Sequence, residues 1–195
     1  MRANPGSLRD TTPPAGQKAP PVSALCLIGF MGAGKSSVGR VLAEKLGWGF
    51  EDLDDRIELR EKRSIGEIFL HSGEPEFRRL EHAALKELLL ESRSRPRVIA
   101  LGGGAFVEPE NRRLLETLPV SLVFLDAPVE ELFRRCQRQR KEQNVERPLS
   151  HDWDQFQKLY EARRASYMGA PRQVSTEGKA LHAVAEEVVK QLGLG

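Results

Sequence analysis

The sequence predicts an α/β protein whose parallel sheet is covered by helices on both faces. Short apolar runs that suit buried strands alternate along the chain with longer segments whose apolar residues recur at helical spacing. The first of these runs leads directly into a glycine-rich loop and then into a helix. Because strands that alternate with helices pair in parallel, their carboxyl ends share one edge of the sheet, and we expect ligands to bind there.

The elements follow in a regular order. The predicted strands are the apolar runs at 24–28, around Phe50, 98–101, 120–125 and 173–174. The predicted helices cover 37–46, a short segment opened by a capping box from Ser64 to Glu67, 75–90, 111–118, 129 to about 138, 152 to about 167, and 180–192.

The composition describes one globular domain. With 195 residues, of which 39% are hydrophobic, the chain is long enough to bury a core of its own. A net charge of +2 gives no general attraction to nucleic acid, and no apolar run approaches the roughly 20 residues of a membrane span. Cys26 falls in the first predicted strand and lies far from Cys136 in sequence, so no disulfide is expected. We expect a cytoplasmic monomer with neither nucleic acid nor membrane as a partner.

Residues 1–22 differ in composition from the rest. They are rich in proline, glycine and small polar residues and have almost nothing to bury, which predicts a disordered tail. The tail also lacks the apolar segment of a secretory signal. Residues 23–195 are then a single domain.

The glycine-rich loop, Gly29–Ser36, fits the pattern G-x-x-x-x-G-K-[ST]. In such a loop the backbone N–H groups surround a polyphosphate, the lysine reaches the β- and γ-phosphates, and the hydroxyl of the last residue is placed for Mg²⁺. The loop therefore predicts that the chain binds a nucleoside triphosphate. The expected nucleotide contacts are Gly32, Ala33, Gly34, Lys35, Ser36 and Ser37.

Two further strand ends carry candidate functional residues. The second strand ends in an acidic cluster, in which Asp52 and Asp54 can hold Mg²⁺ through water or accept the proton of an attacking hydroxyl. The alternative is an ordinary acidic helix start. The third strand ends in Gly102–Gly104, which suits a ligand that lies directly against the backbone, or else a tight turn.

Arginines gather at predicted loops and helix ends that can face these strand ends. They can bind carboxylates and phosphates with two parallel hydrogen bonds, and a kinase needs positive charge on the migrating phosphoryl group. We expect two or three of them to be functional and the others to be solvated. The candidates are Arg78, Arg79, Arg134, Arg135, Arg147, Arg163 and Arg164.

Taken together, these motifs resemble the shikimate kinase family over about 24–174. The matching segments, in the family's order, are Gly29–Ser36, Asp52-x-Asp54, Phe77-Arg78, Gly102–Gly104, Arg147-Pro148-Leu149 and Arg163-x-x-x-Tyr167. The resemblance implies a three-layer α/β/α P-loop kinase with a five-stranded parallel sheet and a mobile lid at about 137–150. It also implies phosphorylation of the shikimate 3-hydroxyl by ATP, with Mg²⁺.

The same resemblance implies individual roles. Lys35, Asp54 and Arg147 would be catalytic, Asp54 by receiving the proton of the attacking hydroxyl and Arg147 by reaching the phosphates from the lid. Arg135 would lie near the nucleotide. Asp52, together with Ser36, would serve the metal. The shikimate pocket would consist of Asp54, Arg78, Gly102, Gly103, Gly104 and Arg163.

Two alternatives remain open at this point. Another small-molecule kinase of the same fold, such as a gluconate kinase, would also use an arginine for a carboxylate, although we do not expect Asp54, Arg78, the three glycines and Arg163 together there. A relative that binds without catalysing would be expected to lack the lysine, the aspartates or the lid arginine, all of which are present. A GTPase is disfavoured because no Asn-Lys-x-Asp motif occurs.

Overall fold

The computed structural model describes residues 23–143 and 152–194. Within them, five parallel strands form one sheet in the order β2-β3-β1-β4-β5. This confirms the predicted α/β class and the five-stranded parallel sheet. The strands are β1 Ala24–Ile28, β2 Gly49–Asp52, β3 Arg97–Ala100, β4 Val120–Asp126 and β5 Gln173–Ser175. The helices are α1 Lys35–Leu46, α2 Leu53–Glu61, α3 Ile65–Glu91, α4 Pro109–Thr117, α5 Val129–Gln143, α6 Trp153–Tyr167 and α7 Leu181–Leu192.

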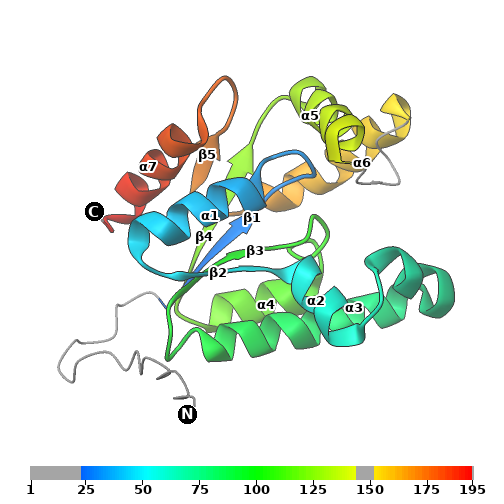
Figure 1. Cartoon of the computed structure of the whole chain (residues 1–195), viewed down its shortest axis with the longest axis horizontal. Coiled ribbons are helices and arrows are strands. Elements are labelled where there is room, and N and C mark those ends of the chain that lie inside the picture. Colours follow the sequence, from blue (N-terminus) through cyan, green and yellow to red (C-terminus); the bar gives the residue numbers. More distant parts are fainter. Residues whose placement is uncertain (1–22, 144–151, 195) are drawn as a thin grey trace, which may run out of the picture.

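The elements form three layers (Figure 1). Helices α1 and α7 lie side by side on one face of the sheet, and α3 and α4 lie on the other. Helices α5 and α6 lie near the end of the sheet where β1 and β4 finish (Figure 1). The carboxyl edge of the sheet is therefore bordered by helices, as expected for a ligand-binding edge.

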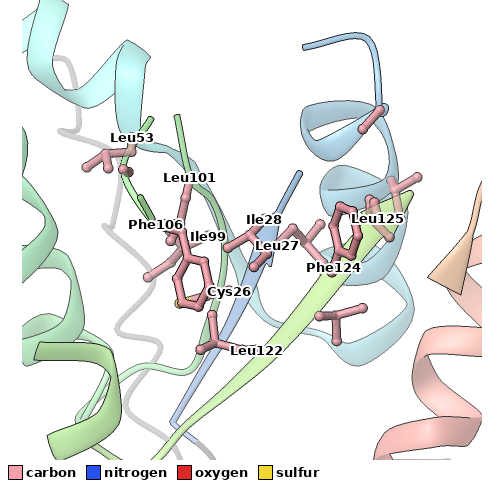
Figure 2. Packing of buried hydrophobic residues seen from close by; sticks show 14 of the residues in the cluster. Cys26, Leu27, Ile28, Leu53, Ile99, Leu101, Phe106, Leu122, Phe124 and Leu125 are labelled. Carbon is pink, nitrogen blue, oxygen red and sulfur yellow. The ribbon is translucent and has the colours of Figure 1, made fainter. Parts of the chain in front are cut away.

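The core lies on both faces of the central strands. Every residue of β1 is buried, with at most 1% of its surface exposed. Figure 2 shows side chains of β3, β1 and β4 packed closely together, with Phe106 from the segment after β3 among them. In the register of the sheet, Cys26 lies beside Ile99 on one side and Leu122 on the other. A continuous apolar strand is stable here because neither of its faces meets water.

Two elements differ from the sequence prediction. Helix α2 was not among the predicted helices, although a helix start at the acidic cluster was an open alternative; its mean hydropathy is low, and only Leu53 and Ile57 are buried. The two predicted helices near 64 and at 75–90 are both present as the two parts of α3, separated by the non-helical residue Gly73, whose φ is 76°. Helix α5 continues to Gln143 instead of ending near 138, so 137–143 of the expected lid are helical. Residues 144–151, the rest of that lid, lie outside the described residues, as does the tail at 1–22.

Several local signals are confirmed. Ser64 and Glu67 form the predicted capping box at the start of α3, and Gly47 ends α1 in the left-handed conformation, with a φ of 66°. Cys26 and Cys136 are both buried and form no disulfide. None of the helices in the described part of the chain is long and apolar enough to cross a membrane.

Candidate active site

The glycine-rich loop connects β1 to α1 and is closely packed. Gly32 has a φ of 82°, and a Cβ atom there would lie 2.6 Å from the carbonyl oxygen of Leu132 in α5. Only glycine fits such a position without moving the neighbouring backbone. Gly34 is the N-cap of α1, with a φ of 87°. The loop therefore ends at a helix N-terminus, where backbone N–H groups can receive an anion.

The functional groups of the loop already have partners. Nζ of Lys35 donates hydrogen bonds to the carbonyl oxygens of Gly29 at 2.9 Å and Phe30 at 3.1 Å, so the ammonium group lies over the loop. Oγ of Ser36 donates to Oδ2 of Asp52 at 2.5 Å. The two residues predicted to serve a metal are therefore in direct contact, although they come from α1 and β2. Ala33 is buried in the loop, and Ser37 lies in the first turn of α1.

The oxygen donors of Ser36 and Asp52 suit Mg²⁺. They do not suit a metal ion whose ligands all come from protein side chains. Both donors are of the hard type that Mg²⁺ prefers, and Mg²⁺ in kinases takes few protein ligands because phosphates and water supply the others. Among the described residues, no group of three or more His, Cys, Asp or Glu side chains could hold a metal ion.

Asp54 lies against the glycine turn. Asp52 is the N-cap of α2, and its Oδ1 accepts a hydrogen bond from the backbone N–H of Asp54 at 3.1 Å. A Cβ atom on Gly102 would lie only 2.6 Å from Oδ1 of Asp54. The N-terminus of α2 thus carries both aspartates, and the absence of a side chain at Gly102 leaves room for the second.

Arg78 reaches the same turn from α3. A Cβ atom on Gly104 would lie 2.7 Å from both terminal nitrogens of its guanidinium group. That group also contacts carboxylates, which hold it in place. They belong to Glu81 at 2.9 Å, Glu74 at 3.0 Å and Glu108 at 3.3 Å.

Arg163 and Tyr167 reach the turn from α6. A Cβ atom on Gly103 would lie 3.5 Å from a terminal nitrogen of Arg163 and 3.9 Å from the hydroxyl of Tyr167. The Tyr167 hydroxyl donates a hydrogen bond to the carbonyl oxygen of Gly103. Burial raises the pKa of Tyr167 to about 12, against the opposing effect of the nearby Arg163 cation. The hydroxyl therefore stays protonated and can keep donating at neutral pH.

The turn is adjacent to the nucleotide loop. The carbonyl oxygen of Gly29 lies 3.9 Å from the position a Cβ atom would take on Gly103. Predicted acceptor-site residues from α2, α3 and α6 therefore meet beside the glycine-rich loop. They are Asp54, Arg78 and Arg163.

Arg135 connects the loop with the segment after β5. Its guanidinium group donates to Oγ1 and to the carbonyl oxygen of Thr176, each at 2.9 Å, and more weakly to the carbonyl oxygen of Gly32 at 3.4 Å. Glu131 holds its Nε at 2.8 Å. Its neighbour Arg134 is largely exposed. Arg147 lies outside the described residues.

Two acidic side chains that contact candidate arginines were not predicted from the sequence. Glu81 is 1% exposed, and burial raises the pKa of its carboxyl group to about 7, against the opposing charge of Arg78. Its spacing of three residues from Arg78 on a helix was the available signal. Asp126 ends β4, and its carboxylate accepts hydrogen bonds from Arg164 at 3.2 Å and Gln173 at 3.0 Å. Its place at a strand end, like that of Asp52, was the corresponding signal.

A glycine-rich phosphate loop lies between β1 and α1, and charged side chains gather at the glycine turn that follows the neighbouring strand β3; this is the arrangement of a P-loop kinase. The family model for shikimate kinase matches residues 31–193. The chain belongs to the shikimate kinase family, and it is an ATP-dependent kinase.

Individual relatives agree. A shikimate kinase of Thermus thermophilus is 42% identical over 176 residues, which are 88% of this chain and 91% of the relative. The structure of the Acinetobacter baumannii shikimate kinase in complex with shikimate has a TM-score of 0.77 at 31% identity and covers 88% of this chain and 93% of its own. A gluconokinase from Sinorhizobium meliloti is only 19% identical, with a TM-score of 0.53 and coverage of 87% of this chain and 91% of its own. It shares the fold, and the likeness shows no more than that.

Proposed function

We propose that this chain transfers the γ-phosphoryl group of ATP to the 3-hydroxyl of shikimate, with Asp54 receiving the proton and Arg78 and Arg163 binding the carboxylate. One observation carries the proposal: these three side chains, from α2, α3 and α6, meet at Gly102–Gly104 beside the nucleotide loop. Two arginines and an aspartate suit a substrate that carries one carboxylate and several hydroxyls.

On the nucleotide side, the backbone N–H groups of Gly32–Ser37 receive the phosphates, and Lys35 binds the transferred phosphoryl group. The lysine exchanges its present carbonyl partners, Gly29 and Phe30, for phosphate oxygens. Ser36 and Asp52, which contact each other, would hold Mg²⁺. The ion would neutralise charge on the phosphates.

On the acceptor side, the carboxylate of Asp54 accepts the hydroxyl proton as the oxygen attacks phosphorus. Asp54 is placed for this role because it lies in the first turn of α2, with its carboxylate against Gly102 of the glycine turn. Arg78 and Arg163 bind the carboxylate at a distance from the reacting hydroxyl, so they orient the substrate and do not take part in the chemistry.

The remaining assignments follow from position and charge. Arg135 supports the nucleotide site, since it joins the loop to Thr176. Arg147 supplies a cation to the transferred phosphoryl group from the segment between α5 and α6. The enzyme acts as a monomer in the cytoplasm. Its two buried cysteines form no disulfide, which suits a reducing compartment.

The test is an assay of ADP release with shikimate, quinate and gluconate side by side. We expect strong preference for shikimate. Arg78→Ala and Arg163→Ala should each raise the shikimate KM by roughly 30-fold or more, since losing one partner of a buried charged pair costs about 2–5 kcal/mol. A shikimate analogue without the carboxylate should show little difference between the variants and wild type. Equal losses on that analogue would contradict the assignment of both arginines.

A further inference from the structure

A buried asparagine connects α4 to the arginine of the acceptor site. Asn111, near the start of α4, is 1% exposed. Its Nδ2 donates to the carbonyl oxygen of Ala105 at 3.0 Å and to Oε2 of Glu81 at 3.4 Å. Its Oδ1 lies 2.8 Å from Nδ1 of His82. The carbonyl oxygen of Ala105 can only accept, so it orients the amide with its N–H groups toward Ala105 and its oxygen toward His82; Nδ1 of His82 then carries the proton.

The buried carboxylate of Glu81 accepts few hydrogen bonds. Its Oε2 accepts from Arg78 at 2.9 Å and from Asn111, whereas Oε1 has no hydrogen-bond partner among the described side chains and backbone groups. A buried carboxylate is unfavourable unless it is paired and hydrogen-bonded. In the described structure, Arg78 and Asn111 are therefore the two groups that donate hydrogen bonds to the carboxylate of Glu81.

The same amide holds the glycine turn. Ala105 directly follows Gly104, and its backbone N–H donates to the carbonyl oxygen of Gly102 at 3.0 Å. The side-chain amide of Asn111 donates one hydrogen bond to Ala105, next to the turn, and another to Glu81 of α3. Asn111 thereby links the turn to α3 and fixes the distance between them. That distance decides where the guanidinium group of Arg78 lies relative to Gly104.

We propose that Asn111 is a positioning residue of the acceptor pocket, which orients Arg78 through Glu81 and through the carbonyl oxygen of Ala105. Asn111 acts on these neighbours and not on the substrate. The inference rests on the proposed function, in which Arg78 binds the carboxylate of the acceptor.

The test begins with two substitutions at this position. Asn111→Leu keeps the approximate size and removes every hydrogen bond, and Asn111→Asp keeps the shape and the acceptor but loses both N–H donors. We expect each to raise the shikimate KM about 10-fold, equivalent to about 1.4 kcal/mol, because positioning of the carboxylate contributes to binding. The KM for ATP and kcat should stay within about twofold. A wild-type shikimate KM in either folded variant overturns the inference.

Ser92→Ala is the matched control for stability. Ser92 is also fully buried, at the other end of α3, where its hydroxyl donates to the carbonyl oxygen of Leu88 at 2.7 Å. Its loss should lower the Tm of the protein and leave the shikimate KM unchanged. If Ser92→Ala raises that KM as much as Asn111→Leu does, a general loss of helix stability explains the effect and the positioning role is wrong.

A double-mutant cycle separates this inference from the proposed function. If Asn111 acts through Arg78, Asn111→Leu should change the shikimate KM less than twofold in an Arg78→Ala background. Full additivity of the two effects overturns the inference. If Arg78→Ala alone leaves the shikimate KM unchanged, the proposed function fails. If Arg78→Ala raises that KM and Asn111→Leu does not, only the inference fails.

Discussion

At the scale of single residues, the guanidinium group of Arg78 is surrounded by carboxylates that differ in exposure. The side chain of Glu81 is 1% exposed, that of Glu108 is 36% exposed and that of Glu74 is 62% exposed. An exposed ion pair contributes little to stability, so one partner is easily replaced by another. Breaking a buried ion pair is costly, because it leaves an unpaired charge away from water. Under the proposed function, the substrate carboxylate would replace the exposed Glu74 at little cost in free energy, while the buried Glu81 would continue to contact Arg78.

The buried carboxyl group of Glu81 predicts a pH-dependent stability. Because burial raises its folded pKa to about 7 from an ordinary value of 4.5, the protonated form is favoured in the folded protein. Its contribution is fully present below pH 4.5 and is lost as the pH rises through 7. Wild type should therefore lose stability relative to Glu81→Gln over this range, by on the order of 2–3 kcal/mol in urea unfolding.

The control for this experiment is Glu74→Gln, which removes an exposed partner of the same arginine. Its effect on the free energy of unfolding should be small, as expected for an exposed ion pair. If the difference between wild type and Glu81→Gln does not change with pH, the ion pair with Arg78 outweighs burial and the Glu81 carboxyl group is ionised throughout.

Lys35, in the glycine-rich loop, leads to a prediction about turnover. Lys35→Ala should reduce turnover by at least about 10³-fold, because in the proposed mechanism this ammonium group binds the transferred phosphoryl group. The circular dichroism spectrum should be unchanged, since the hydrogen bonds described above for the lysine go to backbone carbonyl oxygens of the loop and not to the core. Turnover within threefold of wild type would remove Lys35 from the mechanism.

At the scale of elements, the active site depends on the separation between the glycine turn and the helices α2, α3 and α6. Each glycine faces a different side chain: Gly102 faces Asp54, Gly103 faces Arg163, and Gly104 faces Arg78. A Cβ atom would collide with the neighbouring side chain at Gly102 and at Gly104, whereas at Gly103 it would make an ordinary contact at 3.5 Å. The close approach of Asp54 and Arg78 therefore explains the glycines at 102 and 104.

Gly102→Ala tests this explanation. The added Cβ atom would meet the end of the Asp54 side chain at 2.6 Å, and that side chain can move, so the protein should fold with a displaced carboxylate. We expect kcat to fall about 10²-fold, the usual loss from a misplacement of about 1 Å. Gly66→Ala is the control. A Cβ atom there meets nothing closer than 4.0 Å, and activity should be unchanged, with equal or slightly higher stability. Normal kcat in Gly102→Ala would show that Asp54 is not confined by the turn.

At the scale of the whole molecule, ion pairs tie the edge of the sheet to the helices that carry the acceptor site. Glu91 at the end of α3 contacts Arg56 of α2 at 2.6 Å and Arg97 of β3 at 2.5 Å. Through Glu91, these contacts join α2, α3 and β3 to one another.

A truncation tests the domain assignment. Removal of residues 1–22 should leave kcat within about twofold and shift the Tm by no more than about 2 °C, because this segment has too few apolar residues to contribute to a core. The match to the family model also begins beyond it, at residue 31. A fall in Tm of more than about 5 °C would show that the tail packs on the domain.

Much of the fold and part of the site could be predicted because the relevant signals are local. The apolar run of β1, the glycines and lysine of the following loop, and the capping box at Ser64 each depend on residues within a few positions of one another. The end of α5 could not be placed in this way. Its polar last turns carry no apolar periodicity that distinguishes a helix from a loop.

The sequence by itself determined the class of fold, the nucleotide loop and the residue types needed for a carboxylate-bearing acceptor. Only the tertiary structure decided how those residues meet: Ser36 on Asp52, Arg78 on Gly104, and Glu81 buried between Arg78 and Asn111. The reason is physical. A propensity or a motif acts along the chain, whereas burial and a raised pKa arise from groups that lie 30 residues apart and become neighbours only when the helices pack on the sheet.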